Sequence, residues 1–167
     1  TEIDLRAFTE EIVGVMRPVL DQKGQKIDIV VKPDALPRVP MDKEVLWNVI
    51  QNLLSNASQY SSQNSTIAVG IELQKNMFQY SVRDFGIGIP ENQQGRIFEK
   101  FFRADNALEA VTTGSGLGLS LVKSLVEGWG GRIWFVSRHN EGPTFYFTIP
   151  ALGVEPREGE VKLAVSI

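Results

Sequence analysis

The sequence predicts an α+β fold in two layers, in which three helices cover one face of a mixed, mostly antiparallel sheet of about five strands. Three stretches place apolar residues three or four positions apart, which is the spacing of an amphipathic helix. Five shorter stretches alternate apolar and polar residues, as half-buried strands do. Four of the five form two neighbouring pairs with a short turn between them, which favours antiparallel hairpins.

Length and composition limit the kind of protein this is. The 167 residues suffice for one well-buried domain, expected at 1–150, followed by a tail at 151–167. A net charge of −3 without long basic runs argues against a nucleic-acid partner. There is no apolar run as long as a membrane span and no cysteine for a disulfide or thiolate metal site. We therefore expect a cytoplasmic domain, or the cytoplasmic part of a membrane-anchored protein.

The first half of the chain is predicted to hold two long helices and a strand. Residues 3–20 form an amphipathic helix that Asp4 can cap and that Pro18 can kink or end. Residues 26–31 alternate and predict a strand, which the prolines that follow close. The second helix begins at Asp42 and runs through residue 60.

The second half is predicted to hold two hairpins and the third long helix. Residues 93–98 form a short helix, 104–116 a mobile loop because they are small, polar and glycine-punctuated, and 117–127 the third amphipathic helix. Residues 161–167 could pair as an edge strand. The hairpin strands are 66–73 with 77–82, and 133–137 with 144–149 across a turn at 139–143.

Polar side chains follow one side of the second helix. Asn52, Asn56 and Tyr60 recur at i, i+4 and i+8, so they project from the same side, next to an apolar stripe that suits packing on a sheet. A carboxamide oxygen is a hard, neutral ligand that suits Mg²⁺ beside a polyphosphate. An isolated Asn pair would more simply face water, so this interpretation depends on the motifs downstream.

The run DFGIGIP at 84–90 directly follows a predicted strand. Gly86 and Gly88 let a flat ligand approach the backbone closely. The Asp84 carboxylate accepts hydrogen bonds but cannot donate them, so it would favour the exocyclic amine of adenine over the carbonyl oxygen of guanine. Taken alone, an ordinary Asp-Gly turn explains the run equally well.

The run GSGLGL at 114–119 opens the third helix. Glycines in a first turn expose backbone N–H groups at the positive end of the helix dipole, which suits phosphate oxygens. The run lacks the Gly-Lys-Ser/Thr ending of a Walker A loop, and Leu119 breaks the Rossmann spacing. A tight turn is the plain alternative.

In this order, the asparagine ladder, the Asp-Gly turn, the run FEKFFR at 98–103 and the glycine-rich helix start resemble the ATP-binding catalytic domain of sensor histidine kinases. That family belongs with the ATPases of gyrase, the heat-shock chaperones and the mismatch-repair proteins. The resemblance covers nearly all of 4–150. It implies a Bergerat-type ATP-binding fold that binds Mg-ATP under a flexible lid and transfers the γ-phosphoryl group to a histidine in two-component signal transduction.

The resemblance also assigns roles to individual residues. Asn56 would bind Mg²⁺, Asn52 would lie beside the phosphates as the second catalytic residue, and Tyr60 would line the nucleoside side of the pocket. Asp84 would accept the adenine amine. The predicted nucleotide-binding set is Asn52, Asn56, Gln59, Tyr60, Asp84, Gly86, Gly88, Ile89, Arg103, Gly114, Ser115, Gly116, Leu117, Gly118 and Leu119.

The lid is the least regular part of the resemblance. Its anchor would be Phe98, Phe101 and Phe102, which are expected mainly to pack, and the lid would run to about Gly114. Arg103 could approach the phosphates. The glycines of the run at 114–119 would supply the hinge and the phosphate-facing amides.

Two positions depart from the family pattern, and one residue is missing. Gln59 stands where the family usually has lysine, which removes a positive charge near the phosphates, and Pro143 stands where it commonly has a small residue. The sole histidine, His139, lies in a predicted turn and is expected to be structural or solvent-facing. The substrate histidine would therefore sit on a dimerisation and histidine-phosphotransfer domain preceding Thr1. This chain would be a monomer, the full-length protein a homodimer, and a response regulator receiver domain would take the phosphate.

Three alternatives stay open at this point. A glutamate in place of Asn52 would favour the first, a serine kinase of the anti-sigma-factor type. The amide of Asn52 cannot act as a general base, so bound ATP should be hydrolysed slowly. A nucleotide-binding regulatory module or pseudokinase would bind ATP without phosphotransfer, and Gln59 points that way. An unliganded interaction domain requires all four motifs to coincide by chance.

Overall fold

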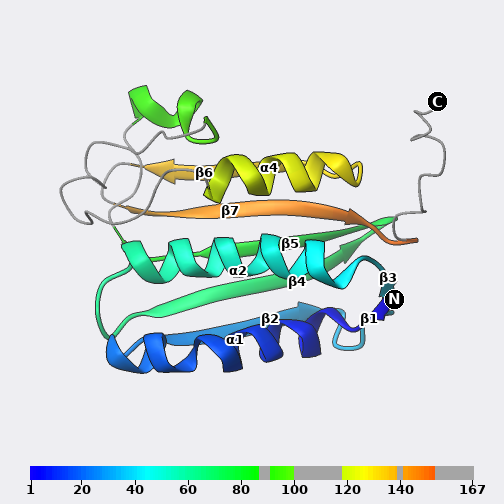
Figure 1. Cartoon of the computed structure of the whole chain (residues 1–167), viewed down its shortest axis with the longest axis horizontal. Helices are drawn as coiled ribbons and strands as arrows, with labels where there is room; N and C mark the ends of the chain where they lie inside the picture. The colour runs from blue at the N-terminus through cyan, green and yellow to red at the C-terminus, as the bar shows by residue number, and fades with distance from the viewer. Residues whose placement is uncertain (87–90, 100–117, 139–140, 153–167) are drawn as a thin grey trace.

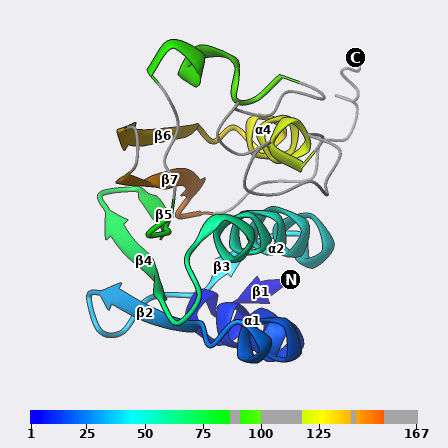
Figure 2. The ribbon, with the colours of Figure 1, turned by 90° about the vertical axis from the view of Figure 1, so that its left-hand side faces the viewer.

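A computed structural model describes residues 1–86, 91–99, 118–138 and 141–152. Within them, three helices lie on one face of a five-stranded sheet, so the predicted two-layer α+β fold is confirmed (Figures 1 and 2). The strand order is β2-β4-β5-β7-β6. The elements of this layered part are α1 (Leu5–Gln22), β2 (Lys26–Lys32), α2 (Lys43–Tyr60), β4 (Thr66–Gln74), β5 (Met77–Arg83), α4 (Gly118–Gly128), β6 (Ile133–Arg138) and β7 (Glu141–Pro150).

Each N-terminal helix begins directly after the aspartate predicted to cap it, although α1 begins at Leu5 and not at residue 3, which lies in a short strand. The Asp4 carboxylate accepts the Ala7 N–H at 3.1 Å, and the Asp42 carboxylate accepts the Val45 N–H at 3.1 Å, so each aspartate caps the helix that follows it. α1 does not end at Pro18, because the helix continues past this residue and ends at Gln22. α2 lies between the other two helices (Figure 1) and buries an apolar stripe that includes Leu46, Val49, Ile50, Leu53 and Leu54.

The sheet is mixed because β2 pairs in parallel with β4, across the crossover that α2 makes. The other three pairings are antiparallel and include both predicted hairpins. Lys75 takes a positive φ of 55° in the β4–β5 turn. β7 begins at Glu141, so Gly142 and Pro143 lie in the strand, and the predicted turn at 139–143 is wrong in its second half.

Three further elements differ from expectation. A two-stranded sheet of β1 (Glu2–Ile3) and β3 (Val39–Pro40) escaped prediction, because pairs this short have no period to detect. The short helix expected at 93–98 is a 3₁₀ helix, η1 (Glu91–Arg96). α4 buries Val122 and Val126, but Leu121 on its predicted apolar stripe is 44% exposed. The loop at 104–116, the segment at 161–167 and His139 lie outside the described residues.

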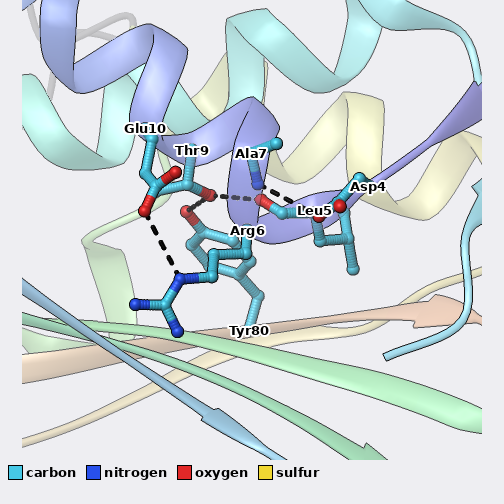
Figure 3. Close-up of polar contacts among 7 residues, drawn as sticks. All are labelled: Asp4, Leu5, Arg6, Ala7, Thr9, Glu10 and Tyr80. Atoms are coloured by element: carbon cyan, nitrogen blue, oxygen red, sulfur yellow. Dashed lines mark hydrogen bonds and ion pairs between the residues drawn. The ribbon is translucent and has the colours of Figure 1, made fainter. Parts of the chain in front are cut away.

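A polar contact joins α1 to the sheet in the core between the layers (Figure 3). The Thr9 hydroxyl donates to the Leu5 carbonyl at 2.8 Å and lies 2.7 Å from the Tyr80 hydroxyl. Because Thr9 has one hydrogen to give, Tyr80 must be the donor in the second bond. Burial raises the pKa of Tyr80 well above its ordinary value, so it keeps this proton. Its ring stacks on Phe147 with centroids 4.9 Å apart.

In the part of the chain that the structure describes, no helix has both the length and the apolar character that crossing a membrane requires.

Candidate functional site

The asparagine ladder of α2 borders the start of α4. Asn52, Asn56 and Tyr60 are all half-buried on this helix. The Asn52 amide nitrogen donates to the Asn48 carbonyl at 2.6 Å, which fixes the orientation of the carboxamide. A Cβ added to Gly118 would lie 3.1 Å from the Asn52 oxygen. The Asn52 oxygen therefore faces the first residue of α4, and two predicted site residues from separate motifs lie together.

The start of α4 has the electrostatic character expected for anion binding. The helix spans Gly118–Gly128, and its first backbone N–H groups have no partner within the helix itself. Those groups lie at the positive end of the helix dipole. Leu119, also predicted as a site residue, is half-buried against the core. This end of α4 combines a neutral amide oxygen from α2 with backbone donors.

The second part of the site is the chain that leaves β5. Asp84 is only 5% exposed, and its Oδ1 accepts the Gly86 N–H at 2.9 Å. No other donor among the described residues bonds to this carboxylate, so Oδ2 keeps its capacity to accept. Burial raises the pKa of Asp84 to about 7, against the opposing effect of the Gly86 hydrogen bond. A buried acceptor held in this way is suited to a ligand amine.

The end of α2 is joined to the Asp84 turn. Ser61, the residue after the helix, forms a β-bridge with Gly86, and its hydroxyl accepts the Phe85 N–H at 3.3 Å. A Cβ on Gly86 would collide with the Tyr60 carbonyl oxygen, so only glycine permits this approach. The Tyr60 carbonyl, Gly86 and Asp84 thus lie together, and the nucleotide-binding roles assigned to them remain predictions. Ser61 was missed, although its place directly after the ladder could have indicated it.

Phe98 packs on the sheet rather than facing solvent. Its ring makes edge contacts with Phe135 and Phe145, with centroids 6.0 Å and 6.2 Å apart. The Lys123 ammonium of α4 lies 5.7 Å from the Phe98 ring centroid. This aromatic contact agrees with the expectation that Phe98 acts mainly through packing.

The structure describes only part of the predicted site. Gln59, on α2, is described and half-buried, whereas several other predicted site residues lie outside the described part of the chain. The described residues contain no group of three or more His, Cys, Asp or Glu side chains that could hold a metal. Asn56 offers a neutral oxygen of the kind Mg²⁺ accepts where phosphates supply the charge. The residues outside the described part are Gly88, Ile89, Phe101, Phe102, Arg103, Gly114, Ser115, Gly116 and Leu117.

Comparison with known proteins gives consistent matches. Residues 41–153 match the family model described as histidine kinase-, DNA gyrase B-, and HSP90-like ATPase. The chain is 38% identical over 151 residues to the adaptive-response sensory kinase SasA of Gloeothece citriformis, covering 90% of this chain and 38% of that protein. It is 33% identical over 147 residues to the sensor histidine kinase WalK of Bacillus subtilis, covering 84% of this chain and 24% of that protein.

A solved structure, the catalytic domain of the histidine kinase ThkA, superposes with a TM-score of 0.78 at 30% identity. The match covers 90% of this chain and 95% of that one. The chain thus corresponds to nearly all of an isolated catalytic domain but to less than half the length of the curated relatives.

Proposed function

We propose that this chain, which belongs to the family of histidine kinase-, DNA gyrase B- and HSP90-like ATPases, is the ATP-binding catalytic domain of a sensor histidine kinase. It binds Mg-ATP and transfers the γ-phosphoryl group to a histidine on a separate dimerisation domain. The observation that carries the proposal is that α2 is joined at one end to the buried Asp84 turn and borders the start of α4 further back. On this proposal, one helix lines both the adenine-selective end and the phosphate-binding end.

The adenine end is selective because of the oxygen that Asp84 leaves available. Oδ1 is occupied by the Gly86 N–H, and Oδ2 would accept the adenine amine. Guanine has a carbonyl oxygen at the same place, which would meet a carboxylate oxygen without a proton between them. Tyr60 and the close approach at Gly86 would complete this side.

The phosphate end combines amide oxygens with backbone donors. With its nitrogen bonded to the Asn48 carbonyl, Asn52 offers its oxygen, so it suits a metal or metal-bound water better than a phosphate oxygen. Asn56 would be the direct Mg²⁺ ligand, and the N–H groups at the start of α4 would bind phosphate. Mg²⁺ neutralises charge on the phosphates when it is bound.

The two described carboxamides of this end, Asn52 and Asn56, would position a nucleotide but would not activate water. The carboxamides of Asn52 and Asn56 cannot take a proton at neutral pH, so they supply no general base for hydrolysis. The γ-phosphoryl group is therefore kept for an acceptor that is brought to it, and catalysis rests on orientation and charge neutralisation. We infer that the acceptor is a histidine on another domain of a homodimer, and that a response regulator receives the phosphate in a later step.

The first experiment is calorimetric titration of the intact chain with ADP and a non-hydrolysable ATP analogue, each with Mg²⁺, and with GTP for comparison. We expect saturable binding of adenine nucleotides and little binding of GTP. Asp84→Asn should abolish this selectivity, because its amide nitrogen would face the adenine amine. Asn56→Ala should remove the Mg²⁺ dependence. Ser55→Ala is the matched control, since Ser55 is exposed on the same helix. No binding by the intact chain would overturn the proposal.

The second candidate function is that of a regulatory module. Gln59 favours it, because glutamine in place of the family's usual lysine leaves one positive charge fewer near the phosphates. A regulatory module would bind Mg-ATP and keep it. Incubation with labelled ATP and a histidine-bearing dimerisation domain separates the two, because a kinase labels that domain with an acid-labile phosphate. Bound ATP without any labelling would favour the regulatory module.

A further inference from the structure

The turn between α1 and β2 places a buried glutamine against the end of α2. Gln25 is 2% exposed, and its amide nitrogen lies 3.1 Å, 3.3 Å and 3.2 Å from the carbonyl oxygens of Ser58, Ser61 and Ser62. Its amide oxygen accepts the Ser58 hydroxyl at 2.7 Å. Both the nitrogen and the oxygen of the Gln25 amide therefore form hydrogen bonds to a segment more than thirty residues away in the sequence.

This contact satisfies groups that the helix cannot satisfy itself. The last carbonyls of an α-helix lack intrahelical partners, and here the Ser61 N–H bonds only to the Ala57 carbonyl. Gln25 takes the Ser58 carbonyl and the two that follow the helix, and the Lys23 ammonium also donates to the Ser58 carbonyl. A cation at this end is also favourable for the helix dipole.

Backbone bonds keep the two turns in register. The Asn64 N–H donates to the Lys23 carbonyl at 2.8 Å, and the Lys26 N–H donates to the Ser65 carbonyl at 3.1 Å. Gly24 and Asn64 both have positive φ, of 64° and 61°. The Gln25 amide that donates to the Ser61 carbonyl therefore projects from a turn whose backbone is fixed by these bonds.

The segment that Gln25 holds is the one that holds the adenine end of the site. Ser61 bridges Gly86, and its hydroxyl accepts the Phe85 N–H. Gly86 in turn donates to Asp84. We propose that Gln25 is a positioning residue for adenine recognition, acting through Ser61 on the Asp84 turn. This inference rests on the proposed function.

The competing explanation is that Gln25 only caps α2 and stabilises the fold. Gln25→Met tests this, because methionine matches the length of glutamine but has no donor. We expect MgADP to bind about tenfold more weakly, since a change of this size corresponds to the loss of one well-placed hydrogen bond. The backbone amide resonances of Phe85 and Gly86 should shift, and the Phe85 amide should exchange faster with solvent.

Thr9→Val is the matched control. It also removes a buried side-chain hydrogen bond between α1 and another element, but that bond leads to Tyr80 in the core. We expect a comparable loss of thermal stability, with MgADP affinity and the Phe85 and Gly86 resonances unchanged. Ser58→Ala is a second test that retains the Gln25 donor and loses only the bond orienting it. MgADP should bind about threefold more weakly to the Ser58→Ala variant. This variant keeps the test possible if Gln25→Met does not fold.

Two outcomes are distinguishable. If Gln25→Met and Ser58→Ala lower stability as Thr9→Val does but leave MgADP affinity and both resonances unchanged, Gln25 is a cap and the inference is overturned. If the intact chain binds no nucleotide, the proposed function fails instead. The Phe85 and Gly86 resonances then still report whether Gln25 orders that turn.

Discussion

At the scale of single residues, Asp84 shows a conflict between stability and recognition. Its carboxylate must be ionised to accept an amine with full strength, yet burial disfavours the charged form and raises the pKa of Asp84 to about 7. The folded chain therefore holds the Asp84 proton more tightly than the unfolded chain, whose aspartates titrate near 4. This difference in pKa should make both binding and folding depend on pH.

Binding should depend on pH through Asp84. Below pH 7 the unliganded site must lose a proton before it accepts the adenine amine, so the Kd for MgADP should rise by about tenfold per pH unit between pH 7 and pH 5. Calorimetry over this range measures the slope. Titration of MgADP alone over the same pH range controls for protonation of the nucleotide itself. A slope that this titration accounts for in full would show that Asp84 does not govern binding.

Folding should depend on pH in the opposite sense. Because Asp84 has a raised pKa in the folded state, its contribution to stability is complete below about pH 4 and is lost as the pH rises to about 7. Asp84→Asn should therefore raise the free energy of unfolding at pH 8, without nucleotide, by on the order of 2 kcal/mol. Urea unfolding at pH 8 and pH 4.5 measures this. An equal effect of the substitution at both pH values would contradict it.

At the scale of elements, α2 contributes to stability and to nucleotide recognition through different parts of its length. Its N-terminus is capped by Asp42, its middle carries the asparagine ladder, and its C-terminus is held by Gln25 and joined to Gly86 through Ser61. Its apolar stripe packs on the sheet in the same turns. Stability at the N-terminal end and recognition at the C-terminal end should therefore be separable.

Removing the cap of α2 should cost stability but not affinity. Asp42→Ala leaves the Val45 N–H without its side-chain acceptor, which costs about 1 kcal/mol. A chain of this size should then melt about 2 to 4 °C lower. Calorimetric melting and MgADP titration measure the two quantities. Asp34→Ala, at an exposed aspartate, is the control and should change neither. A large loss of affinity in Asp42→Ala would show that the two ends of α2 are coupled.

At the scale of the whole molecule, the described elements of the layered fold end at Pro150. All described helices and strands lie between Glu2 and Pro150, and the last β5–β7 pair joins Met77 to Pro150. The predicted boundary between a domain at 1–150 and a tail at 151–167 is consistent with this and remains a prediction.

A chain ending at Leu152 should therefore fold and bind MgADP as the full chain does. Its melting temperature should agree within about 2 °C, which corresponds to less than about 1 kcal/mol. Side-by-side melting and titration of the two chains measure this. A substantial fall in either quantity would assign the residues after 152 to the domain.

The sequence by itself determined the features that depend on neighbours in the chain. Helix caps at Asp4 and Asp42, the periods of helices and strands, and the spacing of Asn52, Asn56 and Tyr60 are local properties, and they were sufficient for the fold class and for the ladder. The tertiary structure alone decided which distant segments meet. The raised pKa of Asp84 comes from burial, and the partners of Gln25 and Ser61 lie in other elements. No local pattern encodes such contacts, because they exist only once the sheet and helices have packed.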